Sequence, residues 1–244
     1  MRSNLGWFLA VSLAYAGLWK IPSAQAVPLV SSGSLGSLAA SAEFDVSGSN
    51  LIVTLTNTSP VDAQVPSDIL TALFFDTVGA SPTLVPVSAV LGPGAVVFFG
   101  GTDPGNVVGG EWAYRQGLSG APLGASRGIS SAGFDLFGPP DLFPGTNLQG
   151  PDSPDGIQYG ITSAGDDPAT GNAAVTGANA LIKNEVVFTL SGLPDGFDPS
   201  TQITHVFFQY GTALTDSGFT PEPSSLALLG IGTLLAFRRS RARR

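Results

Sequence analysis

The stretch 50-NLIVTLTN-57 carries the clearest structural pattern in this sequence. Apolar Leu51, Val53 and Leu55 alternate with residues whose side chains would point to the opposite face of an extended chain. A period of two is typical of a β-strand with one buried face. No stretch of the body keeps a 3.6-residue apolar period long enough for a substantial helix. The pattern therefore predicts an all-β protein.

Further β-rich runs recur between glycines and prolines, which mark turns. The other predicted strands are 69–77, 95–99, 128–137, 156–162, 185–190 and 204–210. Two of them contain continuous apolar runs, Val186–Phe188 and Val206–Phe208, which favour strands covered on both faces. Seven strands at this spacing predict an antiparallel two-sheet sandwich, jelly-roll-like or immunoglobulin-like, with a β-barrel as the alternative.

We expect residues 27–220 to form a single β-sandwich domain of 194 residues. That length can bury a core without disulfides, and the chain has no cysteine. The domain carries three basic and 17 acidic residues, a net charge of −14, although the whole chain has a net charge of −8. Because such a surface cannot neutralise a phosphate backbone, we expect no nucleic-acid partner.

The N-terminus has the features of a signal peptide. Met1 and Arg2 give a positive start, and an apolar run follows over residues 5–19. Ala24 and Ala26 are the small residues that signal peptidase selects, which predicts cleavage after Ala26. Residues 1–26 are therefore expected to direct export and then to be removed.

The C-terminal 24 residues, 221–244, fall into three parts. Pro221, Glu222 and Pro223 are followed by an apolar helix predicted over 224–237 and a basic end, 238–244. The basic residues are Arg238, Arg239, Arg241, Arg243 and Arg244. The apolar residues 226–237 reach roughly 18 Å as a helix, well short of the ~30 Å hydrocarbon core. We therefore expect transient inner-membrane insertion, with the arginines on the cytoplasmic side and the body outside.

This tail resembles the PEP-CTERM sorting domain of Gram-negative bacteria, in which a Pro-Glu-Pro signature precedes a short hydrophobic helix and basic residues. The resemblance implies processing by an exosortase, a membrane protease-transpeptidase of bacteria that make exopolysaccharide or biofilm matrix. Pro221, Glu222 and Pro223 would then be its recognition element. Segments of the body are also similar to a family of exosortase-dependent surface proteins with no assigned activity. These segments are 111–115, 128–133, 134–138 and 207–212.

Few residues of the body are candidates for catalysis or ligand binding. His205 is the only histidine and lies within a predicted strand, so we expect a structural, hydrogen-bonded ring rather than a catalytic one. Glu111 beside Trp112 and Tyr114 is the candidate contact for a glycan, because sugars stack on aromatic rings and bond to carboxylates.

A structural calcium ion is the one cofactor considered, since oxygen ligands are plentiful. The candidate ligands are Asp152, Asp155, Asp166 and Asp167. Their spacing does not match an EF-hand loop, and aspartates beside glycine and proline more often cap turns. We therefore expect no cofactor.

Together these observations favour an exported, non-enzymatic protein of the cell surface or extracellular matrix. Its expected partners are signal peptidase and an exosortase during export, and an exopolysaccharide or envelope glycan afterwards. The alternatives are an extracellular glycan-binding sandwich and a secreted hydrolase that uses paired carboxylates.

Overall fold

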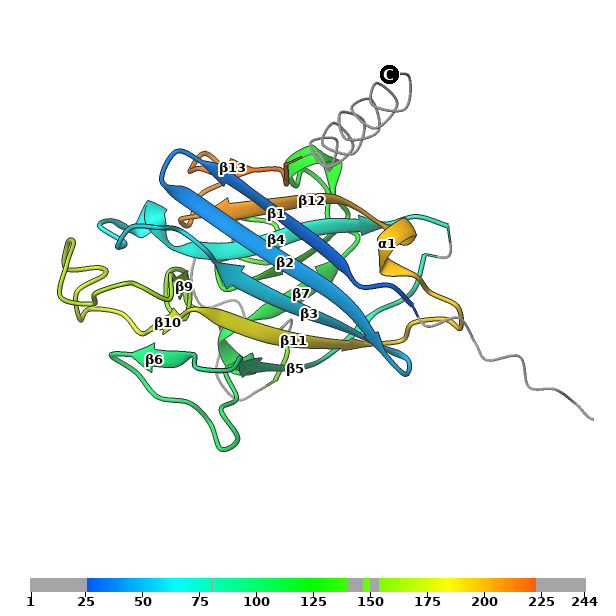
Figure 1. The fold of residues 1–244 in the computed structure, drawn as a ribbon, viewed down its shortest axis with the longest axis horizontal. Coiled ribbons are helices and arrows are strands. Elements are labelled where there is room, and N and C mark those ends of the chain that lie inside the picture. Colours follow the sequence, from blue (N-terminus) through cyan, green and yellow to red (C-terminus); the bar gives the residue numbers. More distant parts are fainter. Residues whose placement is uncertain (1–25, 80, 140–146, 150–153, 223–244) are drawn as a thin grey trace, which may run out of the picture.

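The computed structural model describes residues 26–79, 81–139, 147–149 and 154–222. These residues form two β-sheets, and Figure 1 shows the five-stranded sheet in front of the eight-stranded one. The two-sheet, mainly β architecture that the sequence predicts is confirmed.

The first sheet contains the longest strand, β2, with 10 residues. Its order is β1 (Leu29–Leu35), β2 (Leu38–Ser47), β3 (Asn50–Asn57), β11 (Glu185–Ser191) and β5 (Val85–Leu91). All its pairs are antiparallel. The predicted strand 50–57 coincides with β3, whose residues alternate between half-buried and buried as expected.

The second sheet is longer and more irregular. Its order is β13 (Gly218–Phe219), β12 (Ile203–Tyr210), β4 (Leu70–Thr77), β9 (Ile161–Thr162), β10 (Leu181–Lys183) and β6 (Val96–Phe98), while β8 (Arg127–Ser130) joins β4 to β7 (Ala113–Gln116). The β9–β10 pair is parallel, so the prediction of a wholly antiparallel sandwich is wrong at this pair.

Helical structure in the described residues is limited to single turns. These are α1 (Pro199–Gln202) and the 3₁₀ turns η1 (Pro66–Asp68), η2 (Gly109–Glu111) and η3 (Pro122–Gly124). None of the helices within the described part of the chain has the length and apolar character needed to cross a bilayer.

Aromatic pairs join the two sheets across the core. Phe44 of β2 meets Phe75 of β4 edge to face, with ring centroids 5.4 Å apart. Phe188 of β11 meets Trp112, just before β7, in the same geometry at 5.0 Å. All four rings are fully buried, so the inter-sheet core closes without a disulfide.

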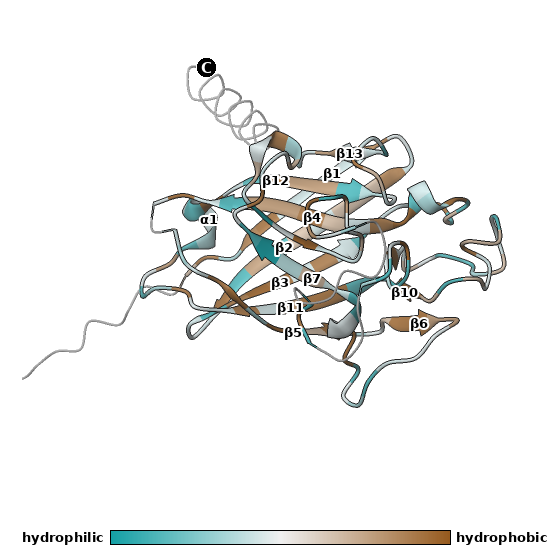
Figure 2. Ribbon diagram, turned by 180° about the vertical axis from the view of Figure 1, so that it is seen from behind, coloured by the Kyte–Doolittle hydropathy of each residue, from teal (hydrophilic) through white to brown (hydrophobic). Residues whose placement is uncertain are grey.

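The second sheet is also covered on its outer side. Along β4, Leu73 and Phe75 face the inter-sheet core, whereas Ala72 and Phe74 pack into a second apolar cluster with Phe134 and others. Because both faces are covered, Leu70–Phe75 are buried without alternation. Figure 2, which views the molecule from behind, shows β6 as a hydrophobic ribbon at the margin of the body.

The two apolar runs behave differently. In β12, Phe207 packs partly buried against the outer cluster, so the prediction of a strand covered on both faces is confirmed there. In β11, Val187 is only half-buried between buried Val186 and Phe188. The prediction is wrong for Val186–Phe188, because the outer face of the first sheet is open to solvent.

Three predicted strands are shorter than expected because single residues adopt left-handed backbone conformations. Phe99 ends β6 with φ 58°, and Tyr159, with φ 55°, lies just before the two-residue β9. Phe134 and Asp135, with φ 53° and 57°, prevent β8 from extending to residue 137. A residue with positive φ interrupts the regular ladder of an extended strand. His205, with φ 51°, does so inside β12, where the pairing with β4 shifts register between Thr204 and Phe207.

Phe188→Ala is expected to lower the free energy of unfolding by about 3–5 kcal/mol, since it removes a buried ring and its contact with Trp112. The control Val187→Ala lies on the adjacent, solvent-facing position and should cost less than about 1 kcal/mol. Urea unfolding measures both values. Equal losses would contradict the assignment of the two faces of β11.

Candidate functional site

The chain leaves the sandwich through β13, which pairs with β12. Phe219 is only 7% exposed and stacks on Tyr210, with ring centroids 5.9 Å apart and an interplanar angle of 28°. It also contacts the Phe208 ring at 5.5 Å. The last strand of the body therefore ends in the core and not in a linker.

The next three residues lie against the edge strand β1. The Glu222 backbone N–H donates a 2.9 Å hydrogen bond to the Ser32 carbonyl, and the Ser34 hydroxyl donates to Glu222 Oε1 at 3.3 Å. Pro221 is half-buried between these contacts and β13. Two of the three predicted sorting residues are thus part of the folded structure.

The other predicted tail residues lie outside the described residues. They are Pro223, the helix 224–237, and Arg238, Arg239, Arg241, Arg243 and Arg244.

At the N-terminal end, Ala24 lies outside the described residues, and Ala26 is half-buried in irregular chain. The next residue, Val27, lies near the carboxylate of Asp198, which caps α1. Hydrogen bonds from the hydroxyl and the backbone N–H of Ser200 lower the pKa of Asp198 below its ordinary value. The first residue after the predicted cleavage site therefore lies near an anionic group of the body.

Trp112 and Tyr114 are not available to a glycan. The Trp112 ring is fully buried and Tyr114 is 4% exposed, both in the inter-sheet core. Burial raises the pKa of Tyr114 to about 12, with a smaller opposing effect of Arg127. Tyr114 pairs with Ile129 in the β7–β8 ladder, and Trp112, which is extended and lies two residues earlier, shares its inward-facing side. The prediction that these rings form an exposed sugar-stacking corner is wrong.

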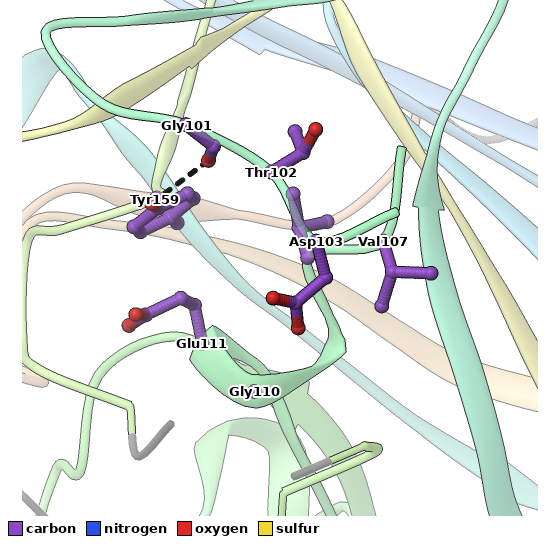
Figure 3. Close-up of a pocket in the computed structure, with 8 residues that line it drawn as sticks. Gly101, Thr102, Asp103, Val107, Gly110, Glu111 and Tyr159 are labelled. Carbon is purple, nitrogen blue, oxygen red and sulfur yellow. Dashed lines mark hydrogen bonds between the residues drawn. The ribbon is translucent and has the colours of Figure 1, made fainter. Parts of the chain in front are cut away.

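Glu111 alone of the three reaches a pocket, which has a volume of about 180 Å³. The pocket is lined chiefly by residues 101–111 and by Tyr159, whose hydroxyl donates a 2.9 Å hydrogen bond to the Gly101 carbonyl. Figure 3 shows the Asp103 carboxylate pointing toward the space between Tyr159 and Glu111. Two carboxylates at one opening disfavour anionic ligands.

The described candidate calcium ligands accept hydrogen bonds from other groups of the protein: a side-chain amide for Asp155, the backbone of its own loop for Asp167 and the backbone of a distant segment for Asp166. Asp155 accepts from the Gln158 amide at 2.6 Å, and Asp167 accepts from the Ala169 N–H at 3.0 Å. Asp166 is 4% exposed and accepts from the Ala63 N–H at 2.8 Å, while burial raises its pKa. Asp152 lies outside the described residues. Within the described ranges no three acidic or histidine side chains gather as a metal site. The expectation of no cofactor, with a structural calcium ion as the alternative, stays a prediction.

His205 has the structural role that the sequence predicts. Its Nδ1 lies 3.0 Å from Asp76 Oδ2, and its side chain is 56% exposed. The other carboxylate oxygen of Asp76 accepts from the hydroxyl and the backbone N–H of Ser126. A serine protease requires the hydroxyl to bond to the imidazole. Here the carboxylate separates them, so the three side chains link β4, β12 and the start of β8.

The comparisons with known proteins locate one feature. Residues 219–244 match the family model described as the PEP-CTERM protein-sorting motif. No curated protein and no solved structure matches this chain. The chain therefore carries the sorting signal of an exported, exosortase-targeted protein, and the matched segment begins at Phe219, the ring that stacks on Tyr210.

Asp76 should make folding stability sensitive to acid. Burial alone would raise its pKa, but hydrogen bonds from Ser126 and His205 together outweigh burial and lower the pKa below 3.8. Stability from a lowered pKa is present at neutral pH and is lost as pH falls through the folded-state pKa. Asp76→Asn should therefore lose less stability than the wild type between about pH 5 and pH 2.

Asp135→Asn provides the matched control, because Asp135 is exposed and already in a left-handed conformation that asparagine tolerates. Urea unfolding across this pH range measures all three proteins. If Asp76→Asn follows the same acid profile as Asp135→Asn, the proposed role of the Asp76 hydrogen bonds is wrong.

Proposed function

We propose that this chain is a non-enzymatic surface or matrix protein, exported with a cleavable signal peptide and processed at its tail by an exosortase. The observation that carries the proposal is the PEP-CTERM sorting motif over residues 219–244. The short apolar run supports it, because a helix of about 18 Å is too short to be a lasting anchor in a bilayer ~30 Å thick.

The proximity of Val27 to Asp198 supports signal-peptide cleavage after Ala26. In the uncleaved chain the Val27 nitrogen near this carboxylate belongs to a neutral backbone amide. Cleavage would turn the amide into a positively charged amino group beside the same carboxylate, and charge-assisted hydrogen bonds are stronger than neutral ones. The positive charge of the mature N-terminus would thereby be complementary to the negative charge of Asp198.

The body supports a structural role after export. Its most chemically versatile side chains serve the fold: Trp112 and Tyr114 fill the core, and His205 bonds to Asp76. Its acidic surface favours solubility outside the cell. The buried rings and the Asp76 cluster present no reactive group to a substrate, and the alternative of a hydrolase would rest on the Asp103 and Glu111 carboxylates that share one pocket.

Intact-mass measurement of the protein outside the cell tests this proposal, in a host that has an exosortase and in the same host without it. With the enzyme, the protein should begin at Val27 and lack the apolar run and the five terminal arginines. Without it, the tail should be retained and the protein should stay with the cells.

The double variant Pro221→Ala/Pro223→Ala should behave in the exosortase-bearing host like the wild type in the host without the enzyme, since it changes the recognition element. Pro194→Ala, an exposed loop proline of the body, is the matched control and should be processed normally. Extracellular wild-type protein that still carries Arg244 would show that the tail is not a processed signal.

A further inference from the structure

The edge of β1 holds the beginning of the sorting motif. The Ser32 carbonyl accepts the Glu222 N–H at 2.9 Å, and the Ser34 hydroxyl donates to the Glu222 carboxylate at 3.3 Å. One main-chain and one side-chain hydrogen bond therefore bind the same motif residue to two positions of one strand.

Gly33, which lies between these two positions, has the shape that this contact requires. A Cβ atom at Gly33 would lie 2.8 Å from the Thr220 carbonyl oxygen, 3.1 Å from Pro221 Cα and 3.3 Å from the Glu222 nitrogen. All three contacts are to backbone atoms, which cannot move aside as a flexible side chain can. The absence of a side chain at Gly33 is thus what lets the segment 220–222 lie flat against β1.

The backbone conformation of Gly33 is not the reason for glycine at this position. Its φ lies outside the left-handed range, and it pairs with Ala40 in the regular ladder between β1 and β2. An alanine would fit that ladder but would collide with the segment 220–222. Gly33→Ala should therefore disrupt the contact with segment 220–222 while leaving the β1–β2 pairing intact.

The segment 220–222 directly follows Phe219, which is anchored in the core of the domain. Phe219 stacks on Tyr210, and the Tyr210 hydroxyl donates a 2.8 Å hydrogen bond to the Ala39 carbonyl of β2. Ala39 is the ladder partner of Ser34. The residues that anchor the last strand thus belong to the same corner of the sandwich as the residues that hold Glu222.

A protease binds an extended substrate through the backbone N–H and C=O groups of the segment that it recognises, much as a sheet edge binds an added strand. In this chain the Glu222 N–H is already bonded, and the side of the segment facing Gly33 is covered. An enzyme that surrounds the motif must first separate it from β1.

We propose that Ser32, Gly33 and Ser34 form a latch that holds Pro221 and Glu222 against β1 and slows exosortase processing until the segment separates. This inference rests on the proposed function, because it concerns the same tail. The folded domain would then control the rate at which the exosortase processes its tail.

Pulse-chase labelling of the full chain in exosortase-bearing cells tests the latch by the rate at which the tail is lost. Gly33→Ala should be processed faster than the wild type, by roughly two- to tenfold, because displacing segment 220–222 loses the main-chain hydrogen bond and the weaker, exposed side-chain one. Ser34→Ala, which removes only the side-chain bond, should show a smaller increase. Gly165→Ala, where a Cβ atom would meet nothing within 4 Å, should match the wild type.

The outcomes separate the latch from the proposed function. A wild-type tail that is lost at the same rate without the exosortase overturns both. Exosortase-dependent processing in which Gly33→Ala is no faster than Gly165→Ala overturns the latch alone. Thermal unfolding of the purified variants shows whether Gly33→Ala is folded. If it is not, Ser34→Ala decides, and a rate equal to the wild type contradicts the latch.

Discussion

The stack of Phe219 on Tyr210 joins the sandwich to its sorting tail, and the rest of the arrangement depends on it. Tyr210 lies on the second sheet, and its hydroxyl bonds to Ala39 on the first, so the same ring links both sheets. With no disulfide in the chain, such buried contacts supply the cohesion of the body. Because Phe219 is also the first residue of the matched sorting motif, folding and sorting share one residue.

Strand positions with strong alternation could be predicted from the sequence, and the predicted bounds of β3 are those observed. The hairpin of β1 and β2 was not predicted, because its inward positions include small residues such as Ala40 and Ala42. The signal was present in Gly36, which has φ 63° and lies in the two-residue turn between the strands. Strand ends set by one left-handed residue, as at Phe99, leave no periodic pattern.

The candidate site also depends on contacts between residues far apart in the sequence, which local patterns cannot predict. The composition around Trp112 resembles a sugar-binding corner, but the direction of its ring follows from the pairing of β7 with β8, which sequence periodicity cannot specify for so short a strand. The contact of Glu222 with Ser34 joins residues 188 positions apart. Gly33 was the only local sign of it, since a strand glycine often marks close approach of another backbone. The tail motif, in contrast, is a contiguous pattern and could be identified directly.

The sorting signal begins inside the folded domain and not after a free linker, because Phe219 is buried in the core and Glu222 bonds to β1. Amide hydrogen exchange at Glu222 in the folded, purified protein tests it most directly. A bonded amide should exchange at least about tenfold more slowly than in the unfolded chain. Exchange at the unfolded rate, while Phe208 in β12 stays protected, would show that residues 220–222 are not held by β1 and would contradict the account.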